Sequence, residues 1–86
     1  MVTMRYFFDL HEDDRVIADE EGFEFNSMDR VQQEAARSLA DMARDAAMIS
    51  AADPNTLKLA IHVRDQRGEP VIKASFSFEV VRSPLQ

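Results

Sequence analysis

The sequence predicts a single α+β domain in which two β-hairpins flank one long helix, in the order β-β-α-β-β. Apolar residues alternate with polar ones over residues 3–10, 57–64 and 71–81, and they recur every three or four residues from Ser27 to about Ile49. Alternation is typical of strands with one buried face, and the longer spacing is typical of an amphipathic helix. Because hairpin strands run antiparallel, we expect a four-stranded, mostly antiparallel sheet with the helix on one face.

The first predicted hairpin begins with a strand over residues 3–10. Residues 11–14 are polar and favour a turn, and residues 15–18 form a short second strand. The acidic stretch Asp19–Gly22 interrupts this strand before alternation returns at 23–25, and its glycine can supply a positive φ. The strand over 3–10 has one face of large apolar side chains, which we expect in the core: Met4, Tyr6, Phe8 and Leu10.

The helix prediction is supported by its ends and by its apolar stripe. Asn26 or Ser27 can cap the N-terminus, and Asp29 lies in the first turn, where the helix dipole favours an acid. Pro54 cannot continue the helix and marks its end. The stripe is rich in alanine, so the axis can approach the sheet closely: Met28, Val31, Ala35, Leu39, Met42, Ala46 and Ile49.

The second predicted hairpin joins two alternating strands through residues 65–70, where Gly68 can take a positive φ. Phe76 is on the predicted core face, and its truncation to alanine should cost roughly 3 to 5 kcal/mol if the ring is buried. The sequence does not decide the strand order, although the aromatic content favours central places for the first and last strands. The expected core faces are Leu57, Leu59, Ile61 and Val63 on one strand and Ile72, Ala74, Phe76, Phe78 and Val80 on the other.

Composition bounds the class of protein. The 86 residues fit one domain, taken as residues 1–86, and there is no cysteine to form a disulfide or a thiolate metal site. No basic leader precedes the first strand, and no apolar run approaches the roughly 20 residues of a membrane span. We therefore expect an acidic, cytoplasmic protein without membrane contact.

The formal charge of −6 is unevenly distributed. Residues 1–26 hold eight acids and two arginines, a net of −6, whereas residues 54–86 hold three acids and five bases, a net of +2. A strongly acidic first hairpin repels phosphate backbones, which disfavours nonspecific binding to nucleic acid.

Three segments resemble a family of short bacterial proteins that are common in rhizobia and related alphaproteobacteria. They are the opening RYFFDLHEDD, the DEEG at 19–22 and the helix start SMDRVQQEAARSLADMARD. Members typically carry a RYFF-like strand, an acidic D-x-E-G stretch and a final hairpin with a D-x-x-G turn, which residues 65–68 match. The resemblance covers nearly the whole chain. It implies a cytoplasmic α+β domain of unknown function with no established activity.

Few residues suggest chemistry. His11 and His62 are the only side chains that ordinarily titrate near neutrality, and neither belongs to a recognised metal-ligand spacing. The acids Asp19–Glu21 fit a solvated turn better than a catalytic pair. No phosphate-binding glycine loop or nucleophile motif is present. We expect no catalytic residue, no metal and no cofactor, and hence no enzyme.

The face of the sheet away from the helix is the best candidate for function. Four residues on or beside it form the predicted interaction surface: Arg5, Phe7, His62 and Lys73. Beside Phe23 or Phe25, the ring of Phe7 would add an apolar patch large enough for self-association. The sequence therefore favours a protein-interaction module, acting as a homodimer or on another protein, through this face or a sheet edge. The alternative is nucleic-acid binding on the open face, with these contacts: Arg5, Phe7, Lys58, Arg64 and Lys73.

Overall fold

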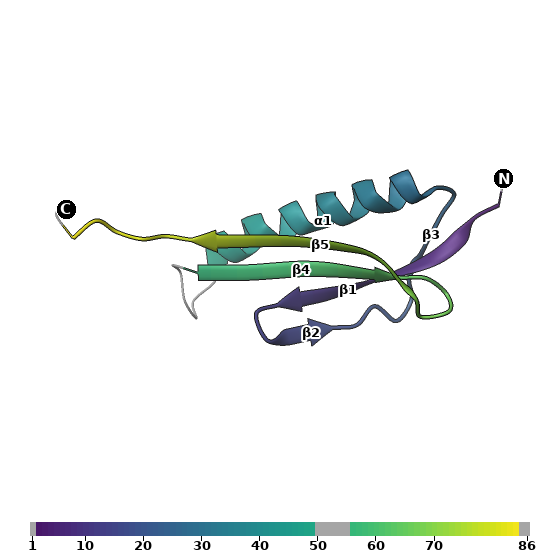
Figure 1. Ribbon diagram of the computed structural model, residues 1–86, viewed down its shortest axis with the longest axis horizontal. Helices are drawn as coiled ribbons and strands as arrows, with labels where there is room; N and C mark the ends of the chain where they lie inside the picture. The colour runs from purple at the N-terminus through teal and green to yellow at the C-terminus, as the bar shows by residue number, and fades with distance from the viewer. Residues whose placement is uncertain (1, 50–55, 85–86) are drawn as a thin grey trace.

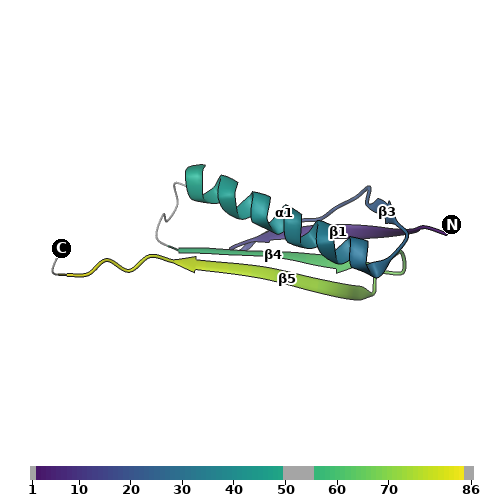
Figure 2. The ribbon, with the colours of Figure 1, turned by 90° about the horizontal axis from the view of Figure 1, so that it is seen from above.

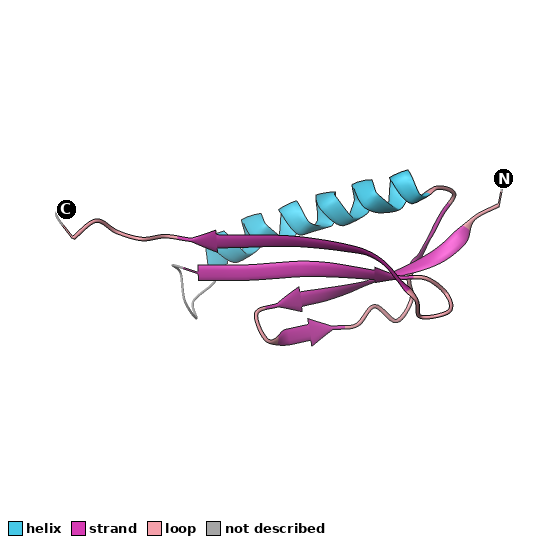
Figure 3. Cartoon of the chain, in the orientation of Figure 1, coloured by secondary structure: helices cyan, strands magenta, loops and turns pink. Residues whose placement is uncertain are grey.

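The computed structural model describes residues 2–49 and 56–84, and it confirms the α+β class (Figure 1). One helix lies along one side of an antiparallel sheet, as the colouring by structure type shows (Figure 3). The described residues form five strands rather than four, because residues 18–22 separate two short strands in the first half. The elements are β1 Met4–Glu12, β2 Arg15–Ile17, β3 Phe23–Phe25, α1 Met28–Ile49, β4 Thr56–Arg64 and β5 Pro70–Glu79.

The sheet has the order β2-β1-β4-β5, and β3 also pairs with β1. All four pairings are antiparallel, with Leu10 opposite both Ile17 and Ile61, and Leu59 opposite Phe76. The prediction that the first and last strands are central is therefore right for β1 and wrong for β5. The aliphatic strand β4 takes the second central place because it is the more buried partner. Aromatic content measures the size of side chains, not their burial.

The core lies between α1 and one face of β1 and β4. Val31 and Ile61 are fully buried, and Ala35 gives the helix axis a close approach to the sheet. Every expected core residue of β4 is buried. The buried apolar set is Tyr6, Phe8, Val31, Ala35, Leu39, Leu57, Leu59, Ile61 and Val63.

The start of α1 follows the predicted capping chemistry. The backbone N–H of Arg30 donates to Ser27 Oγ at 3.2 Å, so Ser27 is the N-cap. The Ser27 carbonyl oxygen accepts the first helical hydrogen bond, from Val31 at 3.3 Å. The predicted helix end near Pro54 lies outside the described residues.

The helix covers β5 unevenly. Figure 2 shows α1 diverging from β4 and β5 toward its C-terminal end. Ile72 and Ala74, early in β5, are partly buried against the core, whereas Phe76 is 38% and Phe78 is 42% exposed. The predicted face of β5 is correct, but the condition of burial is not met for Phe76 because the helix does not lie close over this end.

The molecule is elongated. Its principal extents are 59 × 22 × 19 Å, and its Cα radius of gyration is 15.4 Å. A compact chain of this length would have a radius of about 12 Å. The tail after β5 extends away from the body of the domain, whereas β5 itself is paired with β4 along its length (Figure 1). The side chains in the C-terminal half of β5 are nevertheless exposed.

Candidate interaction surfaces

The face of the sheet opposite α1 carries a compact group of planar side chains. The Arg64 guanidinium lies over the Phe7 ring, 4.5 Å from its centroid. The same guanidinium donates from Nε to Asp9 Oδ2 at 2.9 Å and from Nη2 to the Asp19 carbonyl oxygen at 2.9 Å. These contacts hold Arg64 flat against the sheet and neutralise much of its charge.

Two histidines stack next to this group. The rings of His11 and His62 lie 3.9 Å apart at an interplanar angle of 21°. Burial lowers the pKa of His62, the electrostatic interactions with His11 and Lys73 lower it further, and Asp9 opposes them only in part. His62 therefore stays neutral to lower pH than an ordinary histidine, and a neutral ring is the form that stacks favourably.

The four residues of the predicted surface are only partly brought together. His62 and Lys73 are directly opposite each other on β4 and β5, and Phe7 lies under Arg64. Arg5 lies beside Phe7, since both side chains approach Gly22, but its guanidinium is bound by the β2–β3 loop and β3. Its Nη1 donates to the Glu21 carbonyl oxygen at 2.7 Å, and its Nη2 pairs with a Glu24 carboxylate oxygen at 3.4 Å.

The predicted patch of Phe7 with Phe23 or Phe25 does not form. Phe23 pairs with Tyr6 in the β1–β3 ladder, and residues directly opposite in a ladder share a face. The two β3 rings accordingly contact Phe8, at centroid distances of 6.4 Å for Phe23 and 5.7 Å for Phe25. Both belong to the helix side of the sheet, so the Phe7 side remains mainly polar.

This polar face offers little to a nucleic acid. Of the basic residues expected to contact phosphate, Arg5 pairs with Glu24, and Arg64 pairs with Asp9. Lys58 and Lys73 are the remaining two, on a chain with a net charge of −6. Paired arginines contribute little to counterion release, so the geometry does not favour this alternative.

The loop between β2 and β3 is organised by one carboxylate. Asp19 Oδ2 accepts the Phe8 N–H at 3.1 Å, midway between the two parts of β1 that pair with β2 and β3. Its Oδ1 accepts the Glu21 N–H at 3.1 Å and the Gly22 N–H at 3.0 Å. The side chain thus supplies a bond that a continuous partner strand would make, and it turns the chain back toward β1.

These bonds set the protonation of Asp19. Burial raises the pKa of its carboxyl, but hydrogen bonds from Gly22, Phe8 and Glu21 and the charge of Arg64 together outweigh burial. The net effect is a pKa below the ordinary value. The sequence-based interpretation of Asp19 as one of three solvated acids is therefore wrong. The signal that could have revealed it is its position three residues before a glycine, inside an interrupted strand.

Gly22 fits this loop for two reasons. Its φ is +72°, a region that residues with a Cβ rarely occupy. A Cβ added there would lie 2.8 Å from the Tyr6 carbonyl oxygen. The DEEG segment is therefore a structural motif, in which aspartate binds the backbone and glycine allows the close approach to β1.

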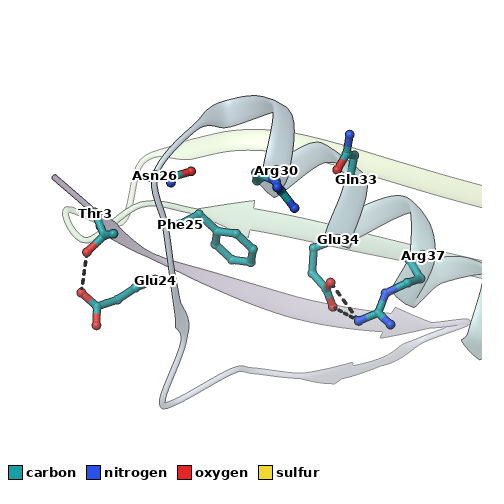
Figure 4. A pocket seen from close by; sticks show the side chains of 8 residues that line it. All are labelled: Thr3, Glu24, Phe25, Asn26, Arg30, Gln33, Glu34 and Arg37. Atoms are coloured by element: carbon teal, nitrogen blue, oxygen red, sulfur yellow. Dashed lines mark hydrogen bonds and ion pairs between the residues drawn. The ribbon is translucent and has the colours of Figure 1, made fainter. Parts of the chain in front are cut away.

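Two open grooves flank α1. The first has a volume of about 450 Å³, and Figure 4 shows the Phe25 ring pointing toward the helix. At its rim Arg37 pairs with Glu34 at 3.0 Å, and Thr3 donates to Glu24 at 2.9 Å, so much of its polar surface is already satisfied. The second groove, of about 540 Å³, lies between the β2–β3 loop and α1 and has an apolar floor that includes Phe8, Leu10, Ile17, Phe23 and Met42.

The outer edge of β5 is an open apolar surface. Among the described residues no strand pairs with this edge. The side chains on its helix side are exposed toward the C-terminal end, and Val80, just beyond the strand, is 43% exposed. Within the described part of the chain, neither Lys73 nor Glu79 takes part in an ion pair. Backbone donors and acceptors, apolar rings and two opposite charges thus occur on one strand.

The described residues contain no cluster of three or more histidine, cysteine or acidic side chains arranged to hold a metal ion. In the same residues, the one helix lacks the apolar length needed to cross a membrane.

Comparison with known proteins identifies the family. The family model described as a domain of unknown function, DUF6894, matches residues 5–77. The match begins within β1 and ends within β5, so it includes the Asp19–Gly22 loop, the helix and both central strands. No curated protein and no solved structure is significantly similar to the chain. With most of its length matched, the chain belongs to the DUF6894 family of domains of unknown function.

Proposed function

We propose that this domain is a protein-interaction module that binds an extended polypeptide along the outer edge of β5, and that it is not an enzyme. One observation supports the proposal above the others. The open backbone edge of β5 and the exposed rings of Phe76 and Phe78 lie on the same half of the same strand. Strand addition uses these two features together, since the backbone provides affinity and the side chains provide selectivity.

The edge carries few of the devices that commonly prevent strand addition. Such devices are prolines, bulges and charged side chains, of which β5 has Lys73 and Glu79. Here Pro70 and the irregularity at Val63/Arg64 affect only the beginning of β5. Lys73 and Glu79 are directly opposite His62 and Thr56, on the face away from the core. From residue 73 onward the edge therefore remains available to a partner.

The location and origin of the domain form part of the same proposal. The resemblance to short rhizobial proteins, together with the absence of cysteine from the sequence, supports a bacterial cytoplasmic protein.

Amide chemical shifts provide the test. The probe is a ten-residue peptide that alternates valine with lysine and glutamate, added at a protein concentration where light scattering gives the mass of one chain. We expect the shifts to concentrate in β5 and to disappear in the double variant Phe76→Ser/Phe78→Ser. Val16→Ser is the matched control, because Val16 is 60% exposed on the other edge strand, β2. Shifts confined to β2 or to the Phe7 face, or no shifts at all, would contradict strand addition at β5.

A further inference from the structure

The proposed function does not identify the partner, but the sequence of β5 indicates which polypeptide it is. Resting on that function, we infer that the partner is a second copy of this chain, paired antiparallel with β5 in the register that places Phe76 opposite itself. The pairing is isologous, so each contact occurs twice. Three independent features of the strand agree on this register: its charges, its apolar side chains and its length.

The charges select the register. Lys73 and Glu79 share the face away from the core and have no ion-pair partner among the described residues. In an antiparallel self-pair each residue faces the one equally distant from the centre. Lys73 therefore faces the partner's Glu79 only when Phe76 is the centre. A centre at Ala74 would instead oppose Glu79 to Glu69, and like charges opposite each other destabilise a sheet.

The apolar side chains fit the same register. On the helix side Phe76 meets the partner's Phe76, and the small Ala74 lies opposite the larger Phe78. Ile72 lies opposite the partner's Val80, which is 43% exposed in the single chain. The pairing of small Ala74 with large Phe78 on either side of the central Phe76 pair leaves room for the rings to pack without voids. The half-exposed rings that α1 leaves uncovered would thus cover one another.

The proposed register also accounts for the extended residues that follow β5. β5 ends at Glu79, but the chain continues outward from the sheet, with Val81 80% exposed (Figure 1). In the Phe76-centred register residues 80–82 lie against residues 70–72 of the partner. The two sheets then form one continuous sheet with both helices on the same face, and the open edge of β5 is removed.

Cysteine cross-linking tests the register directly, because the chain has no cysteine of its own. In Phe76→Cys the two introduced thiols are directly opposite, at a Cα separation of about 4.5–5.5 Å that allows a disulfide. In the control, Ala74→Cys, the two positions are four residues out of register, roughly 13 Å apart. We expect mild oxidation to convert Phe76→Cys to a covalent dimer and to leave Ala74→Cys as single chains. Cross-linking of Ala74→Cys but not Phe76→Cys would overturn the register.

A milder pair of variants covers the case in which Phe76→Cys does not fold. Ser75→Cys and Ser77→Cys change exposed small residues, and in this register each lies opposite the other. We expect a mixture of the two to give the heterodisulfide in preference to either homodisulfide. Equal yields of all three products would contradict the register.

Charge exchange tests the ion pairs. Lys73→Glu opposes two pairs of acids and should raise the dissociation constant of the dimer about tenfold, and the double variant Lys73→Glu/Glu79→Lys should restore the native value. Lys58→Glu makes the same change of charge on β4 and should leave dissociation unchanged. Failure of the double variant to recover would count against the pairing.

Failure of this inference is distinguishable from failure of the proposed function. If the alternating peptide shifts the amides of β5 while none of the cysteine variants cross-links, strand addition stands and the second copy is wrong. If neither occurs, both are wrong.

Discussion

Single residues at the β2–β3 loop hold the first half of the domain in place. Gly22 allows the loop to approach β1, and Asp19 fills the place of a missing ladder bond. Neither residue contributes apolar burial. Their effect on stability should nevertheless be comparable with that of a core side chain, because each contact fixes the path of the backbone.

Gly22→Ala should therefore be more costly than the same change at the other glycine. Both residues have positive φ, +72° and +84°, but an added Cβ at Gly68 meets nothing within 4 Å. We expect Gly68→Ala to lower the free energy of unfolding by about 1 kcal/mol and Gly22→Ala to lower it by more than about 2 kcal/mol. Urea denaturation measures both. Equal losses would show that the contact with the Tyr6 carbonyl oxygen has no consequence.

The Asp19 carboxylate should make the domain sensitive to acid. Its pKa lies below the ordinary value of 3.8, so the charged form is stabilised in the folded state. This contribution to stability is fully present above the unfolded pKa and is lost as the pH falls through the lower, folded pKa. Asp19→Asn should be less stable than the native chain at pH 7 and should lose less stability between pH 5 and pH 2. Parallel acid profiles for the two proteins would contradict this role.

His62 should contribute a second pH dependence, nearer neutrality. Its pKa is lowered from 6.5, so the folded state binds a proton less readily than the unfolded chain. Stability should be highest above pH 6.5 and should fall as the pH drops through that value toward the folded pKa. His62→Gln should reduce the pH dependence of the thermal unfolding midpoint between pH 7.5 and pH 5.5. A slope unchanged by the substitution would exclude His62 as its source.

At the scale of elements, the helix divides the phenylalanines into two groups. Phe8 belongs to the core and is 8% exposed, whereas Phe76 is 38% exposed where α1 diverges from the sheet. We expect Phe8→Ala to lower the free energy of unfolding by roughly 3–5 kcal/mol and Phe76→Ala by about half as much. Chemical denaturation of single chains at low concentration gives both values. A full core cost for Phe76 would mean that the helix covers this end of β5.

Local pattern predicted most of the elements. The three- and four-residue spacing predicted the helix, Asn26 or Ser27 was predicted to cap it, and alternation predicted the inner face of β4. These features depend on contacts within a few residues, or on which side of a strand is apolar. Both are properties that a sequence carries directly.

The features that the sequence did not predict depend on three-dimensional placement. The edge position of β5 depends on which strand pairs with β1, and the exposure of Phe76 depends on the path of the helix. The hydrogen bonds made by Arg5, one of the residues of the predicted surface, depend on placement in the same way. Arg5 found partners in the β2–β3 loop, which lies close in space and is separated by 16 residues in the chain.

At the scale of the whole molecule, the uneven cover of the sheet is the central property. The radius of gyration of 15.4 Å exceeds the value of about 12 Å for a compact chain of this length because the sheet is long and the tail after β5 extends away from it (Figure 1). A small domain buries a modest share of its surface, and here an apolar strand edge is left outside. Dimerisation through β5 would bury that edge without any change in the fold.

The molar mass in solution tests this account most directly. Light scattering across a dilution series should give a mass that rises from 9.8 kDa for the single chain toward twice that value in the micromolar range. The variant Phe76→Ser/Phe78→Ser should remain at 9.8 kDa, and Val16→Ser should behave as the native chain. A native chain that stays at 9.8 kDa up to several hundred micromolar would contradict self-association through β5.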